Sequence, residues 1–425
     1  MKSNQSRRKL NLFLVLLVVW VLVFQFTTIK PAKASSQINL KILVYAKGAA
    51  LLQPYIQQFE QIYPNIAVNI IEGPHASDAI EDLYTASFIL GKTPYDLVYI
   101  DSTWVAKFAA AGWLLDLSDR VSSSDLDRFV KIEVEAGKYG GKLYRVPFLS
   151  GSAMLFYRQD LLEAAGYQPP KTFEDLITTA IAIQQQGLVD WGYAWQGKQY
   201  EGMAAMFVEV LAGYGGFWID PETETVGLDR PEAIAAVEFL RRAIASGISP
   251  PGVTTYTEDE SRRLFEAGKV LFLRNWSYVY NLAANSSVGG KFGIEPMVTI
   301  SGEKGVSCAG GWGLAIAKTS AHPDAAWELI EFLTSDRTQR DYILNTGYQP
   351  SLKSVFSEPQ VVAKYNYYPQ LLAIADRSVL RPGISQYSQA SDILQRYLSA
   401  AIANKMSPEI AMQKAAAETR RLLQN

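Results

Sequence analysis

Short apolar runs and helical patterns alternate along the first part of the chain. Three β-branched, apolar runs predict strands, at residues 38–46, 66–71 and 97–100. Two segments with apolar residues at helical spacing lie between them, at residues 54–63 and 77–90. The order strand, helix, strand, helix, strand predicts a mostly parallel sheet with helices on its faces.

The pattern changes at Gly140, where small residues and a proline lead into a strand and a new helix near residue 160. Helical patterns then dominate, at residues 172–186, 200–211, 231–246 and 259–267. Further strands are predicted at residues 270–275, 292–298 and 306–316, and further helices at 322–333 and 408–423. We find no internal repeat. The alternation of predicted strands and helices indicates an α/β protein.

The stretch CAGGWGLAI, residues 308–316, places three glycines around Trp312. Glycine costs backbone entropy on folding, so these positions need a reason. A strand end where the backbone approaches other atoms would leave the indole face bare. Alternatively, a tight bend places glycines beside a tryptophan that fills the core. The pattern alone leaves both explanations open.

The N-terminus carries an export pattern. Basic residues precede an uncharged, mostly apolar run over residues 10–29, and Ala32-Lys33-Ala34 follows. This order predicts a secretory signal peptide, residues 1–34, that is removed before Ser35. A retained membrane anchor is the alternative, because the run is nearly long enough to span a bilayer. We therefore expect a periplasmic protein.

Composition narrows the classes of partner. The net charge is −2 and becomes more negative without the basic signal peptide, which argues against nucleic acid. The chain has one cysteine, Cys308, and two histidines, so a soft metal site has few ligands and we expect no metal or cofactor. The roughly 390 remaining residues suffice for two lobes with separate cores.

Eight short segments occur in the order found in one protein family. They are F-x-x-x-Y-P at 59–64, DLVYIDSTW at 96–104, AAGWLLDL at 110–117, GKLYRVP at 141–147, WQGKQYEG at 195–202, RNW at 274–276, GGWG at 310–313 and RP at 381–382. Together they resemble the extracellular solute-binding proteins (family 1) of ABC-type carbohydrate importers. The trehalose/maltose- and glucosylglycerol-binding members are the most similar group.

The resemblance implies a two-lobed, type II periplasmic-binding-protein fold, like that of maltose-binding protein, with ligand in the interlobe cleft. Three crossings of the chain are expected near residues 147–152, 306–311 and 347–351. The N-lobe would combine 37–148 with 308–348, and the C-lobe 150–306 with 350–425. It further implies a monomer that is not an enzyme and that delivers its ligand to membrane permease subunits and an ATPase.

A sugar presents a faintly apolar C–H face and a rim of hydroxyls, which aromatic rings and charged groups can bind. Trp276 and Trp312 are the candidates for stacking, one from each lobe, and Gly310 and Gly311 would clear room beside Trp312. WQGKQYEG marks the family, but its chemistry stays unassigned.

Four further residues are candidates for the hydroxyl rim. Asp101 directly follows a buried strand, at the edge where ligands gather in α/β sheets, although it could also cap the next helix. The resemblance implies that Arg381 binds a pair of sugar hydroxyls, with Tyr387 beside it. A guanidinium group suits this role because its hydrogen-bond donors form a rigid fork. The alternative for Arg381 is a surface loop. Glu258 lies where similar proteins place an acid near the ligand, or caps a surface helix.

The chain departs from the trehalose/maltose members at Leu149 and Gly151, where they place an aromatic and an acid. It also has Ile80-Glu81 where similar proteins can offer a basic residue. Fewer hydroxyl acceptors would suit a smaller or differently oriented ligand, such as glucosylglycerol with its single pyranose. These departures leave the exact sugar open.

Two other classes compete with a sugar receptor. A secreted glycoside hydrolase also uses tryptophans and carboxylates, but we find no (β/α)₈ rhythm and no strand ends that pair acids convincingly. A receptor for a charged small solute would need a charge for its ligand and fewer bare indoles. Trp276 and Trp312 therefore favour a sugar.

Overall fold

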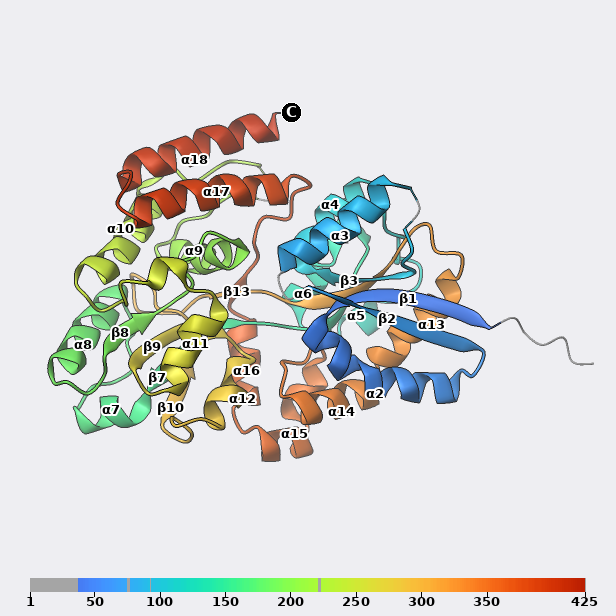
Figure 1. Ribbon diagram of the computed structural model, residues 1–425, viewed down its shortest axis with the longest axis horizontal. Coiled ribbons are helices and arrows are strands. Elements are labelled where there is room, and N and C mark those ends of the chain that lie inside the picture. The colour runs from blue at the N-terminus through green and yellow to red at the C-terminus, as the bar shows by residue number, and fades with distance from the viewer. Residues whose placement is uncertain (1–36, 75–76, 92, 221–222, 425) are drawn as a thin grey trace, which may run out of the picture.

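The computed structural model describes residues 37–74, 77–91, 93–220 and 223–424. The predicted signal peptide lies outside these residues. Figure 1 shows two α/β lobes side by side, one blue and orange and the other green, yellow and red. Within the described residues, no helix combines the length and apolarity needed to cross a membrane.

The first lobe is built on a five-stranded sheet of order β2-β1-β3-β12-β6. Its strands are β1 (Ile38–Tyr45), β2 (Ile66–Gly73), β3 (Leu97–Asp101), β6 (Val146–Leu149) and β12 (Trp312–Ile316). As the pattern predicts, β1 pairs in parallel with β2 and β3. The prediction of a mostly parallel sheet is wrong for β12, which is antiparallel to β3 and β6. The reason is that β12 returns from the other lobe and does not follow a crossover helix of this sheet.

Both faces of this sheet are buried, which explains its unbroken apolar runs. Alternate side chains of β3 enter different cores: Tyr99 packs with the core that includes Phe59, and Val98 with the core that includes Tyr84. The helices of this lobe are α2 (Ala46–Ile62), α3 (Ser77–Ile89), α4 (Val105–Ala110), α5 (Ser123–Leu126), α6 (Lys131–Glu135), α13 (Pro323–Leu333) and α14 (Asp336–Thr346). The predicted start of α2 at Pro54 is wrong, because Pro54 lies inside the helix.

The second lobe is built on a four-stranded sheet of order β10-β7-β9-β8. Its strands are β7 (Ala153–Arg158), β8 (Trp191–Ala194), β9 (Val270–Trp276) and β10 (Phe292–Glu295). Its helices are α7 (Gln159–Ala164), α8 (Phe173–Gln185), α9 (Glu201–Gly213), α10 (Pro231–Ala245), α11 (Glu258–Glu266), α12 (Val279–Ala284), α17 (Tyr387–Ile402) and α18 (Pro408–Leu423). All residues of α9 except two are buried, since it runs through the interior of the lobe.

The chain passes between the sheets from β6 to β7, and returns after β11 (Ser307–Cys308) into β12. A third segment, residues 347–351, leads from α14 into α15 (Pro359–Lys364), α16 (Tyr368–Ala375) and β13 (Ser378–Val379), after a short 3₁₀ helix at Lys353–Ser357. These segments lie side by side: Gly310 N donates to Gly151 O (2.8 Å) and Ser150 N to Gln349 O (3.2 Å). They form the narrow connection between the two lobes (Figure 1).

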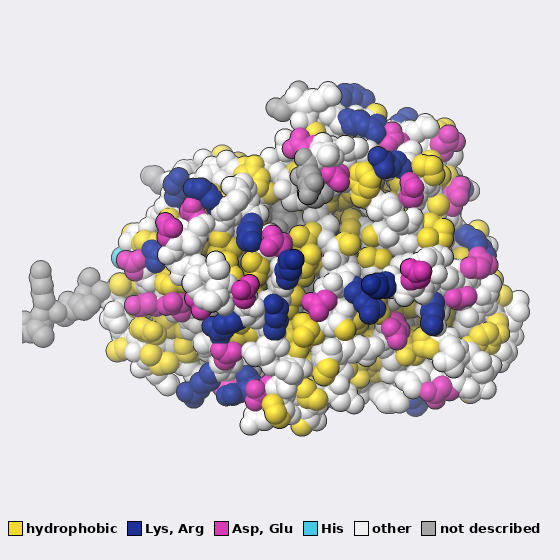
Figure 2. All heavy atoms as spheres, turned by 180° about the vertical axis from the view of Figure 1, so that it is seen from behind, with side chains coloured by type: hydrophobic (Ala, Val, Ile, Leu, Met, Phe, Trp, Pro, Cys, Tyr) yellow, Lys and Arg dark blue, Asp and Glu magenta, His cyan; other side chains and the backbone are white. Residues whose placement is uncertain are grey.

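The face seen in Figure 2 mixes basic, acidic and hydrophobic side chains. Neither sign of charge forms one broad patch on that face. This arrangement agrees with the small net charge of −2 over the full sequence.

Candidate functional site

Trp312 and Asp101 lie next to each other at the end of the first sheet. They are register partners, because β12 runs antiparallel to β3. The Trp312 ring stacks on Tyr99 (centroids 4.8 Å apart, 16° between planes) and meets the edge of Trp104 at 5.4 Å. Trp312 nevertheless keeps part of its surface exposed. The indole is therefore a supported, half-buried ring and does not simply fill the core.

The glycines beside Trp312 stand where other atoms come close. A Cβ atom on Gly310 would lie 2.8 Å from the six-membered ring of Trp276. A Cβ atom on Gly311 would collide with the carboxylate of Glu133, which is buried and paired with Arg145 at 2.9 Å. The backbone at both glycines is thus closely approached by other atoms, as one of the two explanations expects. The expectation that Gly310 and Gly311 clear room beside Trp312 is wrong, because Trp276 and Glu133 occupy that space.

Trp276, the last residue of β9, is held at its edge and on one face. Its Nε1 donates to Glu258 Oε1 (3.3 Å), and Tyr200 Oη donates to the other carboxylate oxygen (2.7 Å). The Arg274 guanidinium lies 4.7 Å from the ring centroid, a cation–π arrangement. The N-cap of α11 is Thr257, so Glu258 is not the capping residue of this helix. Its carboxylate instead orients the indole of Trp276.

Arg381 joins the two lobes. Its Nη1 donates to Glu201 Oε1 at 2.7 Å, within the second lobe, and its Nη2 donates to Asp101 Oδ1 at 3.4 Å, on the first lobe. Asp101 Oδ1 also accepts from Thr103 N (3.0 Å), so Asp101 both caps the helical turn and faces Arg381. Arg381 is 7 % exposed and its Nε has no hydrogen-bond partner among the described residues, which excludes a surface-loop arginine.

Glu201 is the residue that sequence reasoning missed. Its carboxylate accepts hydrogen bonds from Arg381, from Tyr387 Oη and from Ser391 Oγ (2.6 Å). Glu201 lies in the WQGKQYEG segment, whose chemistry stayed unassigned, and this family mark was the signal available. The Glu201 carboxylate thus accepts one hydrogen bond from each of three side chains in the C-terminal part of the chain.

Burial controls the protonation of this network. Loss of hydration raises the pKa of Glu201 above its ordinary value, although Arg381 opposes the shift. Burial and the neighbouring Glu201 carboxylate hold the pKa of Tyr387 well above its usual range, so its hydroxyl stays a donor. The network presents neutral and charge-assisted donors in a water-poor setting, where such bonds are strong.

Contacts and chain continuity join all eight predicted site residues into one group. Asp101 pairs with Trp312, Gly310 touches Trp276, Trp276 bonds Glu258, and Arg381 meets Asp101. Of the two departures from similar proteins, Leu149 is buried beside Trp312, and a Cβ atom on Gly151 would collide with the Gly310 carbonyl.

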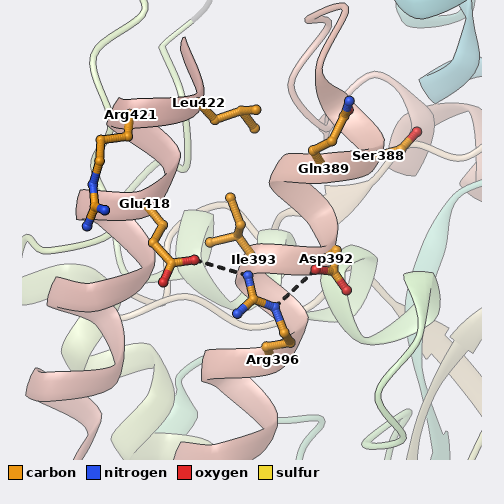
Figure 3. A pocket seen from close by; sticks show the side chains of 8 residues that line it. All are labelled: Ser388, Gln389, Asp392, Ile393, Arg396, Glu418, Arg421 and Leu422. Carbon is orange, nitrogen blue, oxygen red and sulfur yellow. Dashed lines mark hydrogen bonds and ion pairs between the residues drawn. The ribbon is translucent and has the colours of Figure 1, made fainter. Parts of the chain in front are cut away.

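Two hollows lie elsewhere. A groove of about 620 Å³ runs between α17 and α18 (Figure 3), and another of about 470 Å³ lies beside α8 and α10. Neither is lined by a predicted site residue. Over the residues that the structure describes, no three histidine, cysteine or acidic side chains gather in a way that could hold a metal ion.

Comparisons with known proteins agree with this architecture. The sequence profile of the bacterial extracellular solute-binding proteins matches residues 45–340. A probable ABC transporter-binding protein of Deinococcus radiodurans is 29% identical over 356 residues, which is 81% of this chain and 84% of that protein. The maltotriose-binding protein of Pyrococcus abyssi is 26% identical over 73% of this chain and 65% of its own length. The maltose-bound structure of T. maritima MalE3 superimposes with a TM-score of 0.84 and 34% identity, covering 91% of this chain and 100% of MalE3.

Proposed function

Since the chain belongs to the bacterial extracellular solute-binding proteins, we propose that it captures a sugar or glycoside between its lobes and delivers it to an ABC importer. One observation carries the proposal. Two half-buried indoles from different lobes, Trp276 and Trp312, flank a charged network in which Arg381 spans both lobes. That combination offers aromatic faces for a pyranose ring and fixed donors for its hydroxyls.

In this proposal the first lobe combines residues 37–148 with 308–348, and the second combines 150–306 with 350–425. Solute binds the open form, and the lobes then rotate together about the three crossings. Only contacts made in the closed form favour closure, so residues from both lobes must touch the solute. Trp312 and Asp101 serve from the first lobe, and Trp276 and Arg381 from the second.

The solute in this proposal is a di- or oligosaccharide, or a glycoside of the glucosylglycerol type. The similar proteins that bind maltose and maltotriose support the first choice. The departures at Leu149 and Gly151 support a ligand with fewer bonded hydroxyls on that side. Glu258 orients Trp276, and Gly310 allows that ring to approach the segment that leads to Trp312.

The protein works outside the cytoplasm in this scheme, exported by a signal peptide over residues 1–34 and acting in the periplasm. It binds as a monomer, without cofactor, and meets permease subunits and an ATPase that other chains supply. It does not cleave its ligand. A glycoside hydrolase would need two carboxylates free to act across one bond, whereas Asp101 and Glu201 both bond to Arg381.

Calorimetric titration of residues 35–425 with maltose, maltotriose, trehalose, sucrose, glucosylglycerol and glucose tests the proposal. Saturable heat with one sugar, at a Kd on the order of micromolar, is expected. Trp312→Ala and Trp276→Ala should each weaken it by roughly 2 kcal/mol or more. Trp327→Ala is the matched control, because this half-buried tryptophan lies on α13 beneath Arg120. Equal affinity in Trp312→Ala and wild type would refute the site, and release of monosaccharide would refute a pure receptor.

A further inference from the structure

A second contact between the lobes lies beside the network around Arg381, at the residue that follows Tyr387. Ser388, on the second lobe, donates its hydroxyl to Glu81 Oε1 on the first lobe at 2.7 Å. Ser388 is the second residue of α17, and Glu81 lies in the first half of α3. In Figure 1 the start of α17 faces α3, and in Figure 3 the Ser388 hydroxyl points away from α18. We call this hydrogen bond the rim contact.

The acceptor of the rim contact is fixed within its own lobe. The same oxygen, Glu81 Oε1, accepts from Lys107 Nζ at 2.8 Å, and Lys107 belongs to α4 of the first lobe. Glu81 is only 8 % exposed. Because α3 and α4 move together, the carboxylate keeps its place and its charge partner when the second lobe moves away. It is therefore ready to accept the hydroxyl when the lobes approach.

The rim contact can exist only while the lobes are close. Glu81 moves with the first lobe and Ser388 with the second, so rotation about the crossings separates them. A contact made in one of two states favours that state by its own free energy. Neither side chain belongs to the group of residues that flank Trp276 and Trp312. The rim contact thus favours closure without needing the solute.

We propose that the Glu81–Ser388 hydrogen bond sets the affinity of this receptor by stabilising its closed form, so that Ser388 and Glu81 act through this bond as positioning residues. The effect on affinity rests on the function proposed above. The effect on closure does not, since the bond joins two side chains of the protein and involves no solute. A contact made only in the closed form stabilises the closed, solute-bound complex relative to the open form that the solute first meets, which links the two effects.

Ser388→Ala is the direct test, because it removes the hydroxyl and leaves the Glu81–Lys107 ion pair in place. The net strength of a typical protein hydrogen bond predicts binding that is weaker by about three- to tenfold. The loss should appear mainly as faster dissociation, since the bond forms only after closure, and association should not slow, because the variant leaves more molecules in the open form that the solute enters. Stopped-flow tryptophan fluorescence measures both rates, and small-angle scattering of ligand-free protein should show a larger radius of gyration.

Three further variants make the result specific. Ser388→Thr keeps a hydroxyl and should restore both the dissociation rate and the compact form. Ser399→Ala, a half-buried serine further along α17, should behave as wild type. Glu81→Gln weakens the same bond, so adding Ser388→Ala to it should cost much less than Ser388→Ala alone.

Two outcomes overturn the proposal: Ser388→Ala with wild-type rates and radius of gyration, or fully additive losses in the double variant. If the wild-type chain binds none of the sugars, the proposed function fails instead. The scattering comparison of ligand-free Ser388→Ala, Ser388→Thr and wild type still decides whether the rim contact holds the lobes together.

Discussion

Gly310 lies directly against Trp276, so that a Cβ atom at position 310 would be 2.8 Å from the Cη2 and Cζ3 atoms of the indole. Gly310 belongs to a segment that connects the lobes, and Trp276 ends a strand of the second sheet. Because Gly310 has no side chain, Trp276 of the second lobe can come close to the segment that leads to Trp312 of the first lobe.

Gly310→Ala should displace the Trp276 ring and weaken sugar binding by about tenfold. Overpacking of this kind costs roughly 1–3 kcal/mol, and 1.4 kcal/mol corresponds to a factor of ten in affinity. Titration calorimetry measures the change. Gly252→Ala is a suitable control, since its added methyl would come no nearer than 3.3 Å to Tyr256. Wild-type affinity in Gly310→Ala would show that this approach is unimportant for binding.

Glu201→Gln should weaken sugar binding by about tenfold through Arg381 and Tyr387, because the charge-assisted bond that orients the guanidinium is lost. The wild-type Kd should rise as pH falls through the raised pKa of Glu201, above the ordinary value of 4.5. The variant should bind weakly with a flatter pH profile. A variant that keeps the wild-type profile would assign the titration to another group.

The same pKa shift predicts the pH dependence of stability. Burial raises the pKa of Glu201, so the folded chain binds this proton more tightly than the unfolded chain. The stabilising contribution of the neutral acid is complete below the unfolded pKa and disappears as pH rises through the folded pKa. The free energy of unfolding of wild type relative to Glu201→Gln should therefore decrease over that window. Urea denaturation at several pH values measures it, and a rising difference would contradict the assignment.

Glu209→Ala should lower the free energy of unfolding by about 3–5 kcal/mol, because it leaves a buried guanidinium without its partner. Arg274 Nε bonds Glu209 Oε1 at 2.6 Å, and both side chains are fully buried. Arg274 also lies over the Trp276 ring, so sugar affinity should fall as well. Chemical denaturation with Glu238→Ala, an exposed acid, as control gives the comparison. A loss under 1 kcal/mol would show that the pair contributes little.

Cys308 should not react with a thiol reagent such as DTNB while the chain is folded. The thiol is buried, and burial raises its pKa to about 12, so the nucleophilic thiolate is scarce at pH 8. One equivalent should react after denaturation in guanidinium chloride. Rapid reaction of the folded protein would indicate that the core around β11 opens locally.

The sequence pattern predicted those features of the fold that depend on residues close together in the chain. Asp101 ends a short apolar strand, and its position at the sheet edge follows from that strand alone. The family resemblance placed Trp312 in the same lobe as Asp101, but the pairing of the two residues was not predicted, because β12 enters the sheet from the other lobe. The helix α17 was not predicted: no side chain caps its start, and Pro382 and Gly383 before it are typical of a loop.

Glu201 shows why the rest could not be predicted. Its partners Tyr387 and Ser391 lie 186 and 190 residues further along the chain. No periodicity connects residues at that separation, and a glutamate at the start of a helix is ordinary on local grounds. Only the folded chain shows that this acid is surrounded by donors.

The place of β12 in the first sheet has a consequence for the order of events during synthesis. This strand separates β3 from β6, yet it comes from residues 312–316, well after the whole second-lobe sheet has been made. Until the ribosome has produced it, β3 and β6 each expose an unpaired edge, a surface that readily associates with other chains. The first part of the protein to be translated is therefore among the last to complete its fold, and a nascent chain truncated before residue 312 has no means of closing its own N-terminal sheet.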